Sequence, residues 1–250
     1  MTQHWRLCPG YDTPALREAF GSLDAVFALE GERITGDPLS EVLRVTVDGT
    51  RYYVKRYHRA AKNPLRSWVG RPRIQAEWEN LLTFQAWGIR TADIAGYGLE
   101  RRAGTFFRGA LITKEIPGSI DLAQLANARD PRLHDRNWLM PVIRQVAAAT
   151  RTMHEHRFAH NDLKWRNLLV DDGTPPLVYL IDCPAGGSWS GAMLRRRVMK
   201  DLACLDKVAH HVLSRTWRLR FFLAYRGRDR LTADDKPLLR QVLAYFEGRE

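Results

Sequence analysis

Short apolar runs alternate with polar turns through the first half of the chain, and this pattern predicts β-strands. The expected strands are Ala25–Arg33, Val42–Val47, Arg51–Tyr57, Ala92–Tyr97 and Phe106–Lys114. Asp48-Gly49 separates the second strand from the third, which is a strong signal for a tight hairpin. Because side chains alternate along a strand, Tyr53, Lys55 and Tyr57 are expected to share one face.

One amphipathic helix is predicted among these strands, from about Arg73 to Trp87, with Gly88 as its stop signal. Its apolar face is formed by Ile74, Trp78, Leu81, Leu82 and Phe84. At about 100° per residue, Glu77 falls on the side of that face, whereas Glu79 points away from it. A carboxylate that is directed towards a core needs a partner, usually a cation.

The pattern changes at about residue 113, and the chain beyond it is mainly helical. A long helix is expected at Asn137–His156, where Pro141 is tolerated because it lies in the first turn. Two short apolar strands, Leu168–Val170 and Val178–Ile181, flank a polar turn, and the chain from about Ala192 is helical and rich in arginine. The sequence therefore predicts a β-rich part with one helix, followed by a mainly helical part.

Charge and cysteine content narrow the classes of protein that fit. The 250 residues carry 39 Lys and Arg against 28 Asp and Glu, a net charge of +11, so we expect an anionic partner. Candidates are nucleotide phosphates, a membrane surface, a phosphorylated glycolipid and nucleic acid. Three scattered cysteines argue against a disulfide framework or zinc site and favour a reducing compartment. The polar, Pro- and Gly-containing start excludes a secretory signal, and no apolar run reaches the roughly 18 residues of a membrane span.

The stretch from His160 to Asn167 has the form HxDxxxxN, with Asp162 as its acid, and an apolar strand ending in Asp182 follows it. Upstream lie the strand lysine Lys55 and the inward-facing Glu77. Phosphoryl transfer from ATP in protein kinases uses residues of these types. A lysine neutralises the nucleotide phosphates and is held by a glutamate. One carboxylate acts as the base, while an amide and a second carboxylate bind Mg²⁺. The order of these residues along the chain is the protein-kinase order.

On this interpretation Asp162 is the general base, Lys55 and Glu77 form the phosphate anchor, and Asn167 and Asp182 hold Mg²⁺. Lys164 is expected to reach the transferred γ-phosphate.

The sequence also allows purely structural roles for several of these residues. Asp162 and Asn167 would also suit the caps of turns, and Lys55 would also suit an exposed strand. His160 is expected to pack the catalytic loop rather than to act as a base. For Asp201 two roles are equally compatible with the sequence, a helix cap and a hydrogen bond back to the catalytic loop.

With these residues the chain resembles the protein-kinase-like phosphotransferases, and more narrowly the lipopolysaccharide core kinases (the Kdo/heptose kinase, WaaP-like family) of Gram-negative bacteria. The resemblance covers about residues 52–212 and is carried by the stretches 53–57, 76–81, 160–170 and 180–184. It implies an α+β, bilobal protein-kinase-like fold in a single domain, with an N-lobe at about 1–113, a hinge at about 114–118 and a C-lobe at about 119–250. It also implies ATP and Mg²⁺ as cofactors, with Lys114 and Ile116 of the hinge at the nucleotide.

The resemblance further implies an enzymatic activity and a cellular location. The expected reaction is transfer of the γ-phosphate of ATP to a heptose or Kdo hydroxyl of the lipopolysaccharide inner core, in the cytoplasm at the inner face of the inner membrane. Basic clusters at Arg59–Arg73, at Arg195–Arg197 and among the arginines of 215–230 are candidate contacts to an anionic membrane surface. A solvated charged face is the equally weighted alternative, and nucleic acid is not expected because no recognition motif accompanies the charge.

The chain departs from regulated protein kinases at several points. The first hairpin has no GxGxxG, Asn161 replaces the usual arginine between His and Asp, and Asp182-Cys183-Pro184 replaces Asp-Phe-Gly. The segment Pro184–Leu194 is short, and no Ala-Pro-Glu follows it. These departures favour an enzyme that is active without a phosphorylation switch. Two competing functions remain, a kinase of a free small molecule such as an antibiotic or a sugar, and a pseudokinase scaffold.

Overall fold

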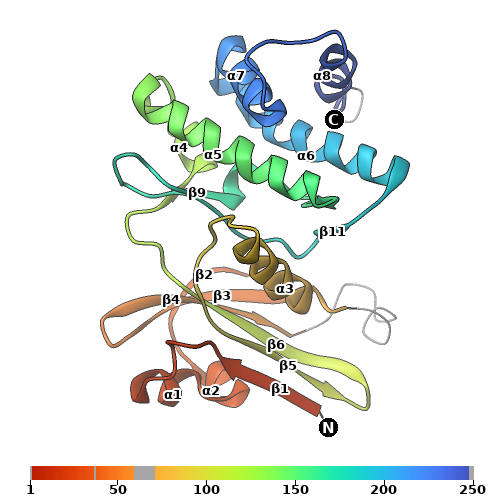
Figure 1. Ribbon diagram of the computed structural model, residues 1–250. Coiled ribbons are helices and arrows are strands. Elements are labelled where there is room, and N and C mark those ends of the chain that lie inside the picture. Colours follow the sequence, from red (N-terminus) through yellow and green to blue (C-terminus); the bar gives the residue numbers. More distant parts are fainter. Residues whose placement is uncertain (1, 37, 59–70, 248–250) are drawn as a thin grey trace. The chain divides into compact units, whose positions relative to one another are not determined.

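A computed structural model of the chain describes residues 2–36, 38–58 and 71–247 and divides into two compact units (Figure 1). Unit 1 comprises residues 1–82 and 92–116, and unit 2 comprises residues 83–91 and 117–250. The change of unit after Ile116 lies within the segment expected to be a hinge, and its role as a hinge stays a prediction.

Unit 1 is built on one antiparallel sheet. Its strands are β1 (Thr2–Leu7), β2 (Glu32–Gly36), β3 (Ser40–Val47), β4 (Thr50–Tyr57), β5 (Ile94–Arg102) and β6 (Thr105–Lys114). They lie in the order β1-β5-β6-β4-β3-β2. The predicted hairpin is confirmed, because β3 and β4 are joined by Asp48 and Gly49, whose φ angles are 48° and 71°. Two positive φ angles are typical of the turn that matches the twist of paired strands.

Helices lie on both faces of this sheet (Figure 1). The short helices α1 (Pro14–Phe20) and α2 (Leu23–Ala28) cover one face. The core between them and the sheet contains Leu16, Phe20, Leu23, Val26, Leu43, Val45, Tyr52, Val54, Ala95, Ala110 and Ile112. Helix α3 (Arg73–Ala86) lies on the opposite face and confirms the predicted helix. The alternation along β4 therefore turns Lys55 away from the α1–α2 core and towards α3.

The strand expected at Ala25–Arg33 is wrong. The structure instead has helix α2 up to Ala28, and strand β2 begins only at Glu32. The side chain of Ser22 accepts a hydrogen bond from the Ala25 N–H and so caps the helix, while Leu23 and Val26, three residues apart, are buried against the sheet. Capping and tertiary packing override the β-propensity of this apolar run. Strand β1 and helix α1 were not predicted at all.

Unit 2 is mainly helical. Its helices are α4 (Leu122–Asn127), α5 (Arg136–Glu155), α6 (Gly191–Val212), α7 (Arg215–Arg226) and α8 (Asp235–Leu243), with 3₁₀ turns at Pro131–Leu133 and Trp165–Asn167. The predicted long helix is confirmed as α5, and the helical remainder as α6 to α8. The core between these helices contains Ala147, Leu202, Ala203, Tyr225 and Val242. No helix in the described part of the chain is both long enough and apolar enough to cross a membrane.

Two small antiparallel sheets in unit 2 position the loop that contains the HxDxxxxN motif. One contains β7 (Ile120–Asp121), β9 (Leu168–Val170) and β10 (Val178–Leu180), and the other pairs β8 (Phe158–Ala159) with β11 (Gly187–Ser188). The loop leaves β8 and enters β9, so its two ends are fixed by different sheets. The predicted strand pair around residues 171–173 is confirmed as β9 and β10.

Candidate active site

In unit 1 the expected ion pair is present. The Lys55 Nζ atom lies 2.8 Å from Glu77 Oε1, and the hydroxyl of Tyr57 donates to the other carboxylate oxygen of Glu77 at 3.4 Å. The Glu77 side chain is only 4% exposed and that of Lys55 is 19% exposed. Glu79, on the outer side of α3, pairs with Arg71 instead. Strand alternation and helix periodicity thus bring together two residues that are 22 positions apart.

In unit 2 the acid of the motif is surrounded by cations. Lys164 Nζ lies 2.5 Å from Asp162 Oδ1, and Arg166 Nη2 lies 3.4 Å from Asp162 Oδ2. Partial burial opposes the charged form of Asp162, but the hydrogen bond and charge of Lys164 and the charge of Arg166 outweigh it and lower its pKa. Asp162 is therefore ionised at neutral pH and has the form that accepts a proton. Arg166 was not expected at this position.

Asn167 lies directly before β9, and Asp182 lies two residues after β10, the strand that pairs with β9. Asn167 is buried and its amide nitrogen donates to the carbonyl of Asp162 at 2.8 Å, which leaves the amide oxygen to face the other way. The Ile181 N–H donates to the carbonyl of Asn167 at 2.9 Å, so Asp182 follows directly after the paired residues. An amide oxygen and a carboxylate are hard oxygen donors of the kind that Mg²⁺ prefers. These two residues therefore fit the predicted metal ligands.

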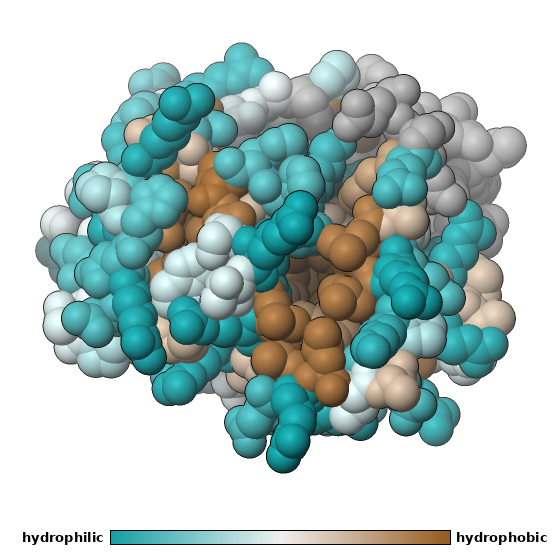
Figure 2. Space-filling model, turned by 90° about the horizontal axis from the view of Figure 1, so that it is seen from above, coloured by the Kyte–Doolittle hydropathy of each residue, from teal (hydrophilic) through white to brown (hydrophobic). Residues whose placement is uncertain are grey.

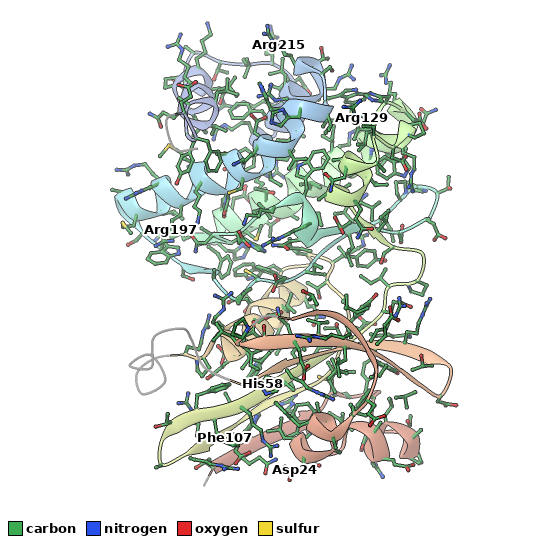
Figure 3. The ribbon with its side chains drawn as sticks, turned by 180° about the vertical axis from the view of Figure 1, so that it is seen from behind. Asp24, His58, Phe107, Arg129, Arg197 and Arg215 are labelled. Carbon is green, nitrogen blue, oxygen red and sulfur yellow. The ribbon has the colours of Figure 1, made fainter. Side chains whose placement is uncertain are left out.

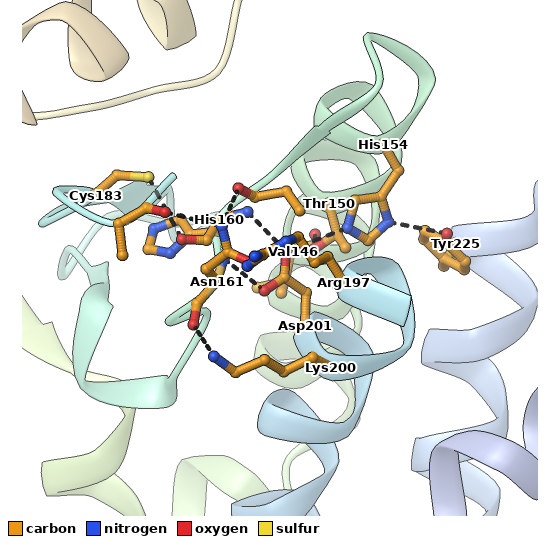
Figure 4. A network of polar contacts seen from close by, with 12 residues as sticks. Val146, Thr150, His154, His160, Asn161, Cys183, Arg197, Lys200, Asp201 and Tyr225 are labelled. Carbon is orange, nitrogen blue, oxygen red and sulfur yellow. Dashed lines mark hydrogen bonds and ion pairs between the residues drawn. The ribbon is translucent and has the colours of Figure 1, made fainter. Parts of the chain in front are cut away.

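A buried carboxylate on α6 fixes the backbone of the loop that contains Asp162. Asp201 is fully buried, and its two oxygens accept the backbone N–H groups of His160 at 2.7 Å and Asn161 at 2.8 Å (Figure 4). Of the two roles left open for Asp201, the structure has the hydrogen bond to the loop. His160 stacks on Phe84, and burial lowers the pKa of its imidazole, so the ring is neutral and packs the loop as expected.

Lys114 and Ile116 lie at the end of β6 and just beyond it, where both are half-buried. Lys114 pairs with Tyr52 in the register of β4 and β6, and its N–H donates to the Asp93 carbonyl at 2.8 Å. Between them Glu115 forms an ion pair with Arg51, which the sequence did not suggest. The contact of Lys114 and Ile116 with a nucleotide stays a prediction.

An apolar cavity of about 1220 Å³ lies between the helices of unit 2, a feature that the sequence did not reveal. Its wall is formed mainly by apolar residues of α5 to α8, including Val146, Leu202, Leu205, Ala209, Phe221, Phe222, Leu239 and Val242. Figure 2 looks onto the α7–α8 end of the chain and shows apolar side chains gathered in a hollow that is ringed by hydrophilic ones. Leu219 and Leu243, which line the cavity, are 36% and 49% exposed.

The basic clusters are in part neutralised within the chain. Arg218 forms an ion pair with Asp206 at 2.6 Å, and Arg226 and Arg228 both pair with the buried Asp235. Arg215, at the start of α7, is exposed (Figure 3). Only part of the C-terminal cluster is therefore available to an external anion. Of the basic segment Arg59–Arg73, residues 59–70 lie outside the described residues.

Comparison with known proteins shows a family and a similar fold. A family model described as the lipopolysaccharide kinase (Kdo/WaaP) family matches residues 22–225. A solved structure described as "WaaP in complex with acyl carrier protein" is similar to the whole fold, with a TM-score of 0.73 and 23% sequence identity, covering 98% of this chain and 98% of that chain. No curated protein matches the chain.

Proposed function

The chain belongs to the lipopolysaccharide kinase (Kdo/WaaP) family, and from this premise we propose that it transfers the γ-phosphate of ATP to a heptose or Kdo hydroxyl of the lipopolysaccharide inner core. The observation that carries the proposal is the ionised, cation-flanked Asp162 in a loop held by the buried Asp201. This is the arrangement that a carboxylate base needs to receive the proton of a sugar hydroxyl.

Each remaining residue of the motif has a role in this reaction. Asp162 orients the acceptor hydroxyl and takes its proton as the oxygen attacks the γ-phosphorus. Lys164, whose ammonium group lies beside Asp162, offsets the negative charge on the transferred phosphoryl group. Lys55, held by Glu77, neutralises the phosphates of ATP.

Mg²⁺ fits the donor set of Asn167 and Asp182, as described above. When bound, the ion would neutralise charge on the nucleotide phosphates. The Asn167 amide also fixes the loop directly, because its nitrogen donates to the carbonyl of Asp162. An alanine at position 167 is thus expected to disturb both the metal site and the base.

The test is an assay of the purified protein with γ-labelled ATP and Mg²⁺ against two kinds of acceptor. We expect label to move to isolated core lipopolysaccharide and to disappear from that acceptor when Mg²⁺ is chelated. Transfer to free sugars or aminoglycosides with none to lipopolysaccharide would favour a kinase of a free small molecule. No transfer to any acceptor, together with no thermal stabilisation by ATP and Mg²⁺, would favour a pseudokinase.

The apolar cavity supports a second part of the proposal, that the chain binds an acyl carrier protein. The similar solved structure was obtained in complex with such a protein. A carrier of an acyl chain presents a long apolar group, and the cavity of about 1220 Å³ offers an apolar wall of matching character. Of the charged residues that line the cavity, Arg218 is paired with Asp206, whereas Lys207 and Arg215 outnumber Glu247, so a partner that carries negative charge is favoured there.

The proposed partner can be tested by comparing the acyl carrier protein with and without its acyl chain. The acylated carrier should raise the melting temperature of the chain, whereas the same carrier without its acyl chain should raise it far less. Equal stabilisation by both forms would place the contact on the protein surface of the carrier rather than in the cavity.

We also propose that the enzyme works in the cytoplasm at the inner face of the inner membrane, where its glycolipid substrate is anchored. Support comes from the exposed Arg195, Arg196 and Arg215, which have no ion-pair partner among the residues that the structure describes. Each basic residue near an anionic surface contributes about 1 kcal/mol. Sedimentation with anionic but not neutral vesicles at low salt would support this contact, and equal sedimentation with both would contradict it.

A further inference from the structure

Asn161 stands between His160 and Asp162, and its polar groups are held by residues far away in the sequence (Figure 4). Its side-chain oxygen accepts a hydrogen bond from Arg197 Nη1 at 2.6 Å, and its side-chain nitrogen donates to the carbonyl of Ala185 at 2.8 Å. Its own carbonyl accepts from Lys200 Nζ at 2.7 Å. The residue directly before the proposed base is thus fixed from several directions.

Arg197 connects this loop to the segment that follows Asp182. Its guanidinium lies over the Trp189 ring, with Cζ 3.6 Å from the ring centroid. Trp189 directly follows β11, which pairs with β8, and its backbone N–H donates to the carbonyl of Arg157 at 2.8 Å. We refer to Asn161, Trp189 and Arg197 together as the clamp. Through it one guanidinium touches both segments that carry the proposed base and metal ligand.

We infer that Arg197 is a positioning residue for the kinase reaction and that it holds the catalytic loop in its working conformation whenever the chain is folded. The inference rests on the proposed role of Asp162 as the base. A guanidinium keeps its charge throughout the physiological pH range, and its planar fork both stacks on Trp189 and donates to Asn161. The contacts of the clamp therefore form without a covalent modification of the chain and without a change in protonation.

The neutral Asn161 is essential to this arrangement. An arginine at that position would place a second guanidinium next to Arg197, whereas the asparagine oxygen accepts its hydrogen bond. Asn161 also has a φ of 64°, in the left-handed region that asparagine tolerates better than most residues. Loss of the clamp is expected to release the loop, and a displacement of about 1 Å at a reacting group costs roughly 10²-fold in rate.

The experiment compares Arg197→Ala, Asn161→Gly and the double variant with wild type in the labelled-phosphate assay. Glycine is used at position 161 because it removes the amide without straining the backbone. We expect each single variant to lower kcat roughly 10- to 100-fold with KM for ATP changed less than about threefold. The kcat of the double variant should be no lower than that of the less active single variant, because both substitutions remove the same contact.

Two controls separate positioning from general stability. Arg144→Ala removes an exposed charge of α5, away from the clamp and from the proposed membrane contact, and should leave kcat unchanged. Arg197→Lys keeps the charge and one donor and should recover part of the lost rate. Hydrogen exchange followed by mass spectrometry should show faster exchange of residues 158–163 in Arg197→Ala and unchanged exchange in Arg144→Ala.

The outcomes are distinguishable. An active wild type together with a fully active Arg197→Ala, or losses that multiply in the double variant, would overturn the inference while leaving the proposed function intact. A wild type that transfers no phosphate to any acceptor would overturn the proposed function and the positioning role with it.

Discussion

Two regions of unit 2 differ in how they fill space. Around the catalytic loop, buried hydrogen bonds fix the backbone: both oxygens of the buried Asp201 accept backbone N–H groups, and Arg197 and Lys200 hold Asn161. Between α5 and α8, apolar side chains instead enclose about 1220 Å³.

The difference separates a region held by hydrogen bonds and ion pairs from one lined by apolar contacts. The backbone of the catalytic loop is held by Asp201, Lys200 and Asn167, as expected for a preorganised site. The cavity, in contrast, offers apolar surface of the kind that an apolar group of a ligand covers. We propose that chemistry and partner binding use separate parts of unit 2, and the following variants test that separation.

The largest effect is expected for Asp162→Asn. Loss of the base should lower kcat by roughly 10²- to 10⁴-fold, while the stabilisation by acylated carrier protein stays as in wild type. Initial rates of phosphate transfer and melting curves measure the two properties. Asp172→Asn, in the exposed turn after β9, makes the same change of charge and should be fully active. Activity of Asp162→Asn within a few-fold of wild type would contradict the assignment of Asp162 as the base.

Asp201→Asn should act on both regions. Asp201 touches the catalytic loop, and it also lies 3.5 Å from His154, which contacts the Tyr225 hydroxyl of α7 at 3.0 Å. The amide of asparagine can accept with one oxygen only, so one backbone N–H loses its charged partner. We expect a fall in the free energy of unfolding of roughly 2 kcal/mol and a 10-fold or greater loss of kcat. Denaturant titration and initial rates measure these, and an unchanged kcat would show that the loop does not depend on Asp201.

Ala209→Phe should act on the cavity alone. Ala209 is buried on α6 and lines the cavity, so a larger side chain there fills part of its volume. At a concentration 100 times the Kd, the acylated carrier should stabilise wild type by about 2.7 kcal/mol and the variant by much less. Its kcat on core lipopolysaccharide should stay within about threefold of wild type, since the catalytic loop is untouched. Undiminished stabilisation by the carrier would place the acyl chain elsewhere.

The smallest effect is expected for Asp235→Asn at the start of α8. The backbone N–H of Thr232 lowers the pKa of Asp235 most, against the opposing effect of burial, and the Thr232 hydroxyl, Arg228 and Arg226 lower it further. A depressed pKa in the folded state adds stability above the unfolded value of roughly 3.9, and this stability is lost as the pH falls below it. The variant should melt below wild type at pH 7, and the gap should narrow below about pH 4. A gap independent of pH would contradict this account.

Local patterns predicted the parts of the site that depend on a single element. The faces of β4 and α3 follow from periodicity alone, so the pairing of Lys55 with Glu77 was foreseeable. The HxDxxxxN spacing likewise identified the loop around Asp162. The run Ala25–Arg33 was misread because packing of Leu23 and Val26 on the sheet decides its conformation.

Contacts between distant elements were beyond local patterns. Arg197 is one of three consecutive arginines, and nothing in the sequence distinguishes it from its neighbours as the partner of Asn161, 36 residues away. The cavity is a property of four packed helices, and each of their apolar faces alone is typical of an ordinary core. The interior ion pairs of Arg218, Arg226 and Arg228 were likewise invisible in the net charge.

The most direct test of the central claim, that Asp162 carries phosphate transfer to the lipopolysaccharide core, is made in cells. The chromosomal copy of the gene is replaced by the Asp162→Asn variant, and the core oligosaccharide is analysed by mass spectrometry beside that of wild type and of the Asp172→Asn control. The account predicts that Asp162→Asn lacks a phosphate on a heptose or Kdo residue that both other strains retain. A core that carries the same phosphates in all three strains would contradict it.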